Sequence, residues 1–364
     1  MRRKIIIPGL CLSVLLSTGI ASCAVQQQKN IQTTPASRLP DGTAQATNIT
    51  TSRTVEAANA FLATLDTSER AQVSIPFNNE NKTRWSNFPA IAVARNGLRW
   101  GDLNTAQRTA AMNLLATALS DRGLQKVKAI VEGDEVLKTT ESGRNGEPIF
   151  GRDIYYIALL GTPSLAEPWM IQFGGHHLAI NLTIVDKSNV LTPTLTGAQP
   201  ASYKLDGETV RPLGRENDKS FALVNSLNTA QRQKAILNYQ VSDLVLGPGE
   251  DGKTIQPEGI KASELNAEQQ QRLLDLAQEW VGILNNEAAT TKMAEIEANL
   301  SETWFAWSGP TTPGSAAYFR IQGPTLVIEY SPQRSRGSNN LDLGHIHTIY
   351  RDPTNDYGER LVQQ

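Results

Sequence analysis

Two stretches of the chain place apolar residues at the three-to-four-residue spacing of an amphipathic helix. They contain Met112, Leu114, Leu115 and Leu119 in the first stretch, and Leu273, Leu274, Leu276, Ala277, Trp280, Ile283 and Leu284 in the second. Each stretch follows a Leu-Asn-x-x-Gln opening, which begins at Leu103 and Leu265 and occurs once more at Leu227. In this opening Asn suits the N-cap and Gln the N3 position, which together form a capping box. We therefore expect a helix directly after each opening.

Short runs of β-branched and aromatic residues follow the first and third of these helices and predict strands. They lie at 155–160, 169–173 and 178–182 in one set, and at 304–307, 318–321 and 326–330 in the other. Aligning Gly175 with Gly323 matches Asn181 with Glu329. The match predicts an internal duplication of about 100–185 and 262–333, although any helix followed by a hairpin would give a similar pattern. Both interpretations predict an α+β fold, in which helices cover antiparallel sheets.

The N-terminal segment has the pattern of a secretion signal. Arg2, Arg3 and Lys4 precede an apolar run at 5–16, and small residues precede Cys23. This order is typical of a signal peptide, and its end resembles the bacterial lipobox, in which the cysteine is lipidated. We expect residues 1–22 to be a signal peptide and Cys23 to anchor the protein to the membrane, facing the periplasm or the exterior. The alternative is an ordinary signal peptide with an incidental cysteine.

Composition divides the remaining chain into two parts. Residues 23–53 are rich in Gln, Thr, Asn and Ala without apolar periodicity, which predicts a flexible tether. Residues 54–364 then form a single α+β domain. Because Cys11 lies in the signal peptide and Cys23 carries lipid, we expect neither disulfides nor thiolate metal ligands. Removing the three N-terminal cations takes the formal net charge from −2 to −5, and no basic patch suggests nucleic acid as a partner.

One segment matches a phosphate-binding pattern. Residues 247–254 read Gly-Pro-Gly-Glu-Asp-Gly-Lys-Thr, which fits G-x-x-x-x-G-K-[ST]. That chemistry needs a helix that starts at the Lys-Thr pair, so that its N-terminus faces the phosphates. Pro257 and Gly259 follow within a few residues and would break such a helix. We therefore expect a turn-rich loop here and no nucleotide triphosphate as a partner.

All four histidines fall in two close pairs, each preceded by glycine. They are His176 and His177 after Gly174-Gly175, and His345 and His347 after Gly344. Imidazole is the commonest metal ligand, and two histidines at i and i+2 lie on the same side of a strand. In the run after Gly175, one face carries His177 and Asn181, whereas the other carries His176 and apolar residues that suit the core. This clustering predicts one site that contains residues from both pairs.

The predicted ligands are two or three imidazoles and a carboxylate. His345, His347 and Glu329, with His177 as a further nitrogen, suit a divalent transition metal and leave positions for water. Zinc is the first choice, with Fe, Mn or Cu(II) as alternatives. His176 and Asn181 are alternative or supporting ligands, and the choice between His176 and His177 stays open. The opposing interpretation is that the histidines satisfy buried backbone groups and bind no metal.

A polar turn follows the last histidine. Arg351 lies on the same strand face as His345 and His347, and could bind an anionic substrate group. Asp352 or Asp356 could accept a hydrogen bond from the ring nitrogen of a ligating histidine that does not bind the metal. Asp-Pro and Asn-Asp are also turn formers, so the segment could equally be a structural turn.

Four segments together resemble one known family. They are the Gly-His-His run at 169–181, the Leu-Gly-Pro-Gly loop at 246–249, the strand ending at 328–330, and His-x-His through Asp-Tyr-Gly at 345–358. The family is the largely bacterial one catalogued as domain of unknown function 3500. The resemblance implies an exported protein with one shared domain, and it implies no particular reaction.

These patterns predict a lipid-anchored, extracytoplasmic metal-binding protein. As an enzyme it would be a metal-dependent hydrolase acting on a small or anionic substrate. The alternative is a non-catalytic surface module that binds a metal or a small solute.

Overall fold

The computed structural model describes residues 42–143, 146–334 and 340–362. The expected signal peptide and the lipidation of Cys23 lie outside the described residues, as does most of the expected tether. Among the described residues, no helix is both long and apolar enough to cross a membrane.

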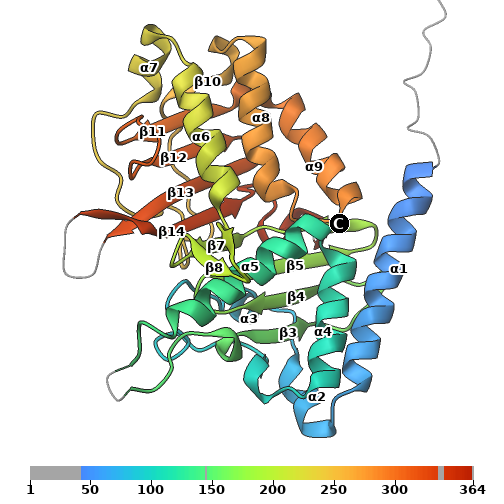
Figure 1. The fold of residues 1–364 in the computed structure, drawn as a ribbon. Coiled ribbons are helices and arrows are strands. Elements are labelled where there is room, and N and C mark those ends of the chain that lie inside the picture. Colours follow the sequence, from blue (N-terminus) through green and yellow to red (C-terminus); the bar gives the residue numbers. More distant parts are fainter. Residues whose placement is uncertain (1–41, 144–145, 335–339, 363–364) are drawn as a thin grey trace, which may run out of the picture. The chain divides into compact units, whose positions relative to one another are not determined.

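A twelve-stranded sheet forms the centre of the described chain (Figure 1). Its strands run, in spatial order, β1 (Ser74–Ile75), β3 (Tyr156–Leu160), β4 (Trp169–Gly174), β5 (Leu178–Val185), β7 (Thr194–Ala198), β14 (Leu341–Arg351), β13 (Leu326–Arg334), β12 (Tyr318–Gly323), β11 (Trp304–Ser308) and β10 (Ile260–Lys261). β2 (Leu98–Arg99) pairs with β3, and β6 (Ser188–Val190) pairs with β5. All pairings are antiparallel except β1 with β3. β8 (Tyr203–Leu205) and β9 (Glu208–Val210) form a separate hairpin.

Helices cover one face of this sheet (Figure 1). The longer ones are α1 (Gly42–Ala63), α4 (Thr105–Ala118), α5 (Asp121–Leu137), α6 (Gly214–Ser226), α8 (Ala267–Val281) and α9 (Asn286–Ala298). The described chain also contains the short helices α2 (Thr67–Val73), α3 (Asn79–Lys82), α7 (Thr229–Ala235) and α10 (Glu359–Val362), and the 3₁₀ turns η1 (Trp100–Asp102), η2 (Arg152–Ile154), η3 (Ala262–Glu264), η4 (Leu300–Glu302) and η5 (Asp356–Gly358). The three expected capping boxes are confirmed at the starts of α4, α7 and α8.

The main core lies between the sheet and these helices. Leu178, Ile180 and Leu182 of β5 all belong to it, as the alternation in the sequence predicted. Trp280 of α8 is fully buried there; burying a large apolar side chain stabilises the fold by about 1.5–3 kcal/mol. This packing holds β5 and α5 in place; His177 directly precedes β5, and α5 carries Asp134 of the site described below.

Loops cover the opposite face of the sheet. Trp85, from the loop at 76–97, packs on Ala179, Leu195 and Ile349 of the three central strands β5, β7 and β14. A second loop, at 237–259, approaches β13 and places the backbone N–H of Val245 2.7 Å from Glu329. Asn181 and Glu329 on this face of the sheet are therefore buried beneath loops and not exposed to solvent.

The expected α+β class with antiparallel strands is confirmed, with one large sheet. Residues 42–53, which the composition assigned to the tether, belong to α1. Composition missed this helix since its contacts are long-range: Thr54 is buried and its hydroxyl donates to the carbonyl of Thr117 in α4 (3.4 Å). Threonine and alanine suffice where a helix packs closely on another helix.

Candidate metal centre

Three histidines from two distant segments meet beside the central strands. His345 and His347 lie on one side of β14, and His177 lies in the turn between β4 and β5. β7 joins the two segments: Gly197 pairs with His347 and donates its N–H to the carbonyl of His177 (2.6 Å). The pairing of β5, β7 and β14 therefore brings residue 177 next to residues 345 and 347.

The three Nε2 atoms converge. Nε2 of His345 lies 3.2 Å from Nε2 of His177 and 3.0 Å from Nε2 of His347. Metal–nitrogen bonds of 2.0–2.1 Å imply a separation of about 3.3 Å between two nitrogen ligands at a tetrahedral angle, and about 2.9 Å at a right angle. The observed distances lie between these values. The three ligand atoms could hold one metal ion.

Hydrogen bonding between the rings cannot account for both close contacts. A neutral imidazole nitrogen is either a donor or an acceptor, and in the ring plane it serves one partner. His345 Nε2 faces two other Nε2 atoms, so in one of the two contacts the nitrogens face each other with no proton between them. A cation bound by all three lone pairs removes this conflict.

A buried carboxylate orients His177 from behind. Asp134 of α5 is 1% exposed and its Oδ1 lies 2.5 Å from Nδ1 of His177. Tyr155 donates its hydroxyl to Oδ2 of the same carboxylate (2.7 Å). Since an ionised carboxylate only accepts, His177 carries a proton on Nδ1, and Nε2 is the atom that it can offer to a metal. Carboxylate–histidine pairs of this kind are the usual support of a metal-bound imidazole.

The electrostatics keep Asp134 ionised. Burial by itself would raise the pKa of Asp134, but the charge of His177, its hydrogen bond and the nearby ring of His176 outweigh it and hold that pKa below its ordinary range. Burial and the neighbouring Asp134 raise the pKa of Tyr155 well above its ordinary value. Tyr155 therefore remains a donor to the carboxylate at neutral pH.

The other imidazoles are neutral at physiological pH. Burial, followed by the charges of His177 and His176, lowers the pKa of His345 to about 3. Burial lowers the pKa of His347 well below its ordinary value, and burial with the charge of His177 lowers that of His176 to about 4. Neutral imidazoles have the free lone pair that a metal requires.

A loop residue contacts the third histidine. The side-chain amide of Asn87 lies 3.2 Å from Nδ1 of His347. It favours a free Nε2 on that ring when its oxygen faces Nδ1, because the amide N–H would instead place the ring proton on Nε2. Arg95 anchors this loop, because one guanidinium nitrogen donates to the carbonyls of Ser86 (2.8 Å) and Gly175 (3.0 Å). The arginine thus ties the loop that carries Asn87 to the turn that carries His177.

Gly197 leaves the space that two of the rings occupy. A Cβ atom at this position would lie 2.9 Å from Cδ2 of His177 and 3.1 Å from Cδ2 of His347. Real Cβ contacts are hardly ever shorter than 3.0 Å. The absence of a side chain here is a steric requirement of the site.

His176 stands beside the three converging rings. Its ring centroid lies 3.7 Å from that of His177 and 4.5 Å from that of Phe150. Its Nδ1 lies 3.7 Å from Oδ1 of Asp134, beyond hydrogen-bond distance, and is buried without a partner in the described chain. With Asp134 and His177 it forms a second group whose spacing could hold a cation.

The structure places Glu329 elsewhere and corrects its expected role as a ligand. Its carboxylate accepts hydrogen bonds from the N–H groups of Val245 and Leu246 (2.7 Å each) and from the hydroxyl of Tyr318 (2.8 Å). It is fully buried and belongs to neither of the two groups that could hold a metal. A carboxylate with these three donors serves to fix the loop at 237–259 against β13.

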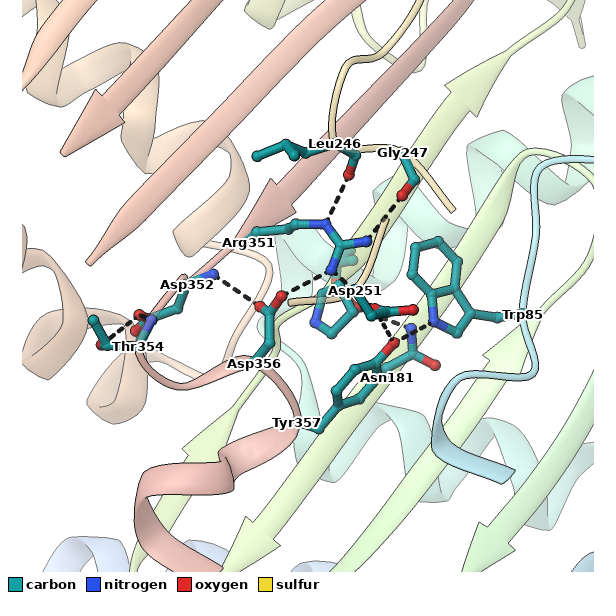
Figure 2. Close-up of polar contacts among 12 residues, drawn as sticks. Trp85, Asn181, Leu246, Gly247, Asp251, Arg351, Asp352, Thr354, Asp356 and Tyr357 are labelled. Carbon is teal, nitrogen blue, oxygen red and sulfur yellow. Dashed lines mark hydrogen bonds and ion pairs between the residues drawn. The ribbon is translucent and has the colours of Figure 1, made fainter. Parts of the chain in front are cut away.

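Arg351 is likewise engaged within the protein (Figure 2). Its guanidinium donates to the carbonyls of Leu246 and Gly247 and forms ion pairs with Asp251 (3.0 Å) and Asp356 (2.8 Å). It is 3% exposed. Arg351 therefore fastens the Gly-Pro-Gly loop, and the expected role in binding an anionic substrate finds no support in this geometry.

Three further predicted residues have structural contacts away from the imidazoles. Asn181 accepts from Gln172 (2.9 Å) and donates to the carbonyl of Pro193 (2.9 Å). Asp352 pairs with Lys292 (2.5 Å), and Asp356 accepts from the backbone of Asp352 (2.9 Å) as well as from Arg351. The carboxylate that supports an imidazole is Asp134 rather than Asp352 or Asp356.

The sequence reasoning missed Asp134, Tyr155 and Asn87. A signal for Asp134 was present, because it continues the buried stripe Val127, Ile130, Leu137 of an otherwise amphipathic helix. A lone carboxylate on the apolar face of a helix needs a buried partner. Tyr155 and Asn87 carry no comparable signal, since their roles arise from tertiary contacts alone.

These features define an α+β protein with a buried three-histidine site that could hold a metal ion and a carboxylate that orients one of its ligands. The chain belongs to the family described as protein of unknown function DUF3500, whose model matches residues 47–359. Neither a curated protein nor a solved structure matches it.

Proposed function

We propose that this protein binds one divalent transition metal, zinc as first choice, through His177, His345 and His347. The observation that carries the proposal is the convergence of three Nε2 atoms, two pairs of which lie 3.0 and 3.2 Å apart. Burial lowers the pKa of His345 and His347, which keeps both rings neutral. Three histidines with a fourth, open position are the ligand set of a catalytic zinc site.

We propose hydrolysis as the chemistry of this site. A bound divalent metal with an open position supplies activated water or polarises a carbonyl or phosphoryl oxygen. Solvent access is favoured from the side of His345, because its side chain is partly exposed whereas His177 and His347 are 0% and 4% exposed. Asp134 would keep the Nδ1 proton of His177 in place throughout, since its carboxylate holds that proton on the side away from the ligand atom.

The direct test is the metal content of the purified, full-length protein after expression with supplemented zinc, iron, manganese and copper. We expect close to one metal per chain, and its loss in His177→Ala, His345→Ala and His347→Ala. His176→Phe is the matched control: it replaces a buried ring that stacks on Phe150 and should retain the metal. A metal-free wild-type protein, or full metal content in the three alanine variants, would contradict the proposal.

A non-catalytic metal-binding module is the second candidate. The burial of two of the three imidazoles favours it, because a closed site stores or senses a metal more readily than it turns over a substrate. Water proton relaxation on the Mn- or Cu-loaded protein separates the two candidates. An exchanging water on the metal supports hydrolysis, and its absence supports the binding module.

We further propose that the protein is exported and lipid-anchored through Cys23. The basic, apolar and small-residue segments that precede the cysteine support this location. Labelling with a radioactive or alkyne fatty acid in a bacterial host should mark the wild type and leave Cys23→Ala unmarked. Labelling of Cys23→Ala would overturn the assignment.

We also infer that the two halves of the domain come from one duplicated unit. Matching polar pairs support it: Gln172 faces Asn181 across β4 and β5, and Arg320 faces Glu329 across β12 and β13. Asn96 donates to Gln172 (2.7 Å), and Glu258 accepts from Arg320 (2.9 Å) at the corresponding place.

The helix caps correspond too, since the N–H of residue 120 bonds to the carbonyl of 283 and the N–H of 285 to the carbonyl of 118. Superposing the halves of an experimental structure tests this, and fails if these pairs do not coincide.

A further inference from the structure

We propose that a cavity beside α9, distinct from the histidine site, binds a small neutral polyhydroxylated ligand such as a monosaccharide or a cyclic polyol. The cavity has a volume of about 160 Å³ and lies between the β5–β6 hairpin, α9 and the C-terminal turn. A cavity of roughly 150 Å³ holds a six-membered ring. No histidine lines it, so the inference is independent of the metal.

The polar side of the cavity offers both a donor and an acceptor. Lys292 is held between Glu295 (2.9 Å) and Asp352 (2.5 Å), and its side chain is 13% exposed. An ammonium has three protons to donate, so one remains after these two pairs. On the other wall, Oδ1 of Asn189 is buried and has no hydrogen-bond partner among the described residues. Leaving a buried oxygen unpaired is unfavourable, and a ligand hydroxyl that donates to it would offset this cost.

The charges in the cavity favour an uncharged ligand. Lys292 pairs with Asp352 and Glu295, and Arg360 approaches Glu295 (3.4 Å). These two paired cations are balanced by two carboxylates, whereas Lys187, the third cation of the lining, is exposed to solvent. A charged ligand would disturb the balance among the paired groups. A hydroxyl can accept from the lysine and donate to Asn189 in turn, which a purely donating or purely accepting ligand cannot.

The remaining wall is apolar. It is formed mainly by Val190, Leu191, Leu284, Ala288 and Leu361. Such a surface suits the C–H face of a sugar ring, while the ring hydroxyls reach the polar side. This combination of an apolar wall and a few placed polar groups is typical of small-molecule sites.

The position of the cavity corresponds to that of the histidine site, which rests on the duplication inferred above. Ser331 of β13 pairs with His347, and Thr183, at the corresponding place in β5, pairs with Val190. In the first half, Val190 therefore occupies the strand-pairing position that His347 occupies in the second half.

Titration of the full-length protein with D-glucose, N-acetyl-D-glucosamine and myo-inositol, followed by calorimetry and by amide chemical shifts, tests the proposal. We expect at least one of them to bind at millimolar or lower concentration. Asn189→Leu should weaken that binding about tenfold, as the loss of one hydrogen bond implies. Ala288→Phe, which fills the cavity without touching its polar groups, should abolish it.

His345→Ala is the matched control and should leave sugar binding unchanged while removing the metal. The proposal fails if none of the three compounds binds, or if D-glucuronate, as an anionic probe, binds in their place. The proposal also fails if the Ala288→Phe protein still binds the sugar while its unfolding temperature, equal to that of the wild type, shows that it is folded.

Discussion

The carboxylate of Asp134 lies 2.5 Å from Nδ1 of His177, although the two residues are 43 positions apart in the chain. α5 brings the carboxylate to the site, and the turn between β4 and β5 brings the imidazole. The same carboxylate receives the hydroxyl of Tyr155. Asp134 thus links the helical layer to the histidines on the sheet.

Asp134→Asn should weaken metal binding by about 10–100-fold, the usual effect of losing a carboxylate behind a metal-bound histidine. The amide can present its N–H to Nδ1 of His177, which would shift the ring proton to Nε2 and block the ligand atom. Competition with a chromogenic chelator measures the affinity. Tyr155→Phe removes only one donor from the carboxylate and should have the smaller effect; an equal or larger effect would contradict this assignment.

Gly197→Ala should reduce metal affinity and destabilise the protein by about 1–3 kcal/mol, because the new methyl group overlaps the rings of His177 and His347. Metal titration and urea unfolding measure the two effects. Gly133→Ala is the control: it adjoins Asp134 in α5, yet its new Cβ would be 3.4 Å from the nearest atom of Tyr203. A Gly197→Ala protein with wild-type metal affinity would show that the rings do not need this space.

Glu329→Gln should lower the free energy of unfolding by about 1–3 kcal/mol while leaving the metal content at the wild-type level. In the wild type the carboxylate accepts from the backbone N–H groups of Val245 and Leu246. The amide NH₂ of glutamine would place a donor against one of these donors. Elemental analysis with urea unfolding separates the two outcomes. Loss of the metal in a folded Glu329→Gln protein would restore this residue as a ligand.

The metal-free protein should gain stability with rising pH relative to a His345→Gln variant. Burial lowers the pKa of His345 to about 3 in the folded state, whereas an unfolded histidine titrates near 6.5. Between these values the unfolded state binds more protons, so the unfolding free energy rises with pH by up to about 1.4 kcal/mol per unit and levels off above 6.5.

The raised pKa of Asp356, about 6 because of burial, acts in the opposite direction. The contribution of Asp356 is present in both proteins, so it cancels in the difference between their free energies of unfolding. Urea unfolding in a chelator between pH 4.5 and about 7 measures this difference. A difference that does not change with pH would mean that His345 is solvated in the folded protein.

Local patterns predicted much of the fold. The capping boxes at Asn104, Asn228 and Asn266 depend on residues three apart, so they could be recognised from the sequence alone. The face that carries Leu178, Ile180 and Leu182 followed from the two-residue period of a strand. α1 was underestimated because its support comes from α4 and not from its own composition.

The site divides in the same way. That His345 and His347 share one side follows from their spacing on a strand, and it was visible in the sequence. Glu329 and Arg351 also lie on strands beside the histidines, but loop groups near Val245 and Gly247 bind their charges. Spacing along a strand does not show which loop covers a side chain.

The sequence by itself determined the periodic elements, the pairs of histidines and the glycines beside them, because each depends on neighbours along the chain. Only the tertiary structure decided that His177 meets His345 and His347, and that Asp134 stands behind it. Those contacts depend on the order of β5, β7 and β14 and on the packing of α5. Strand order and helix docking are set by burial summed over the whole core, which no local stretch of sequence contains.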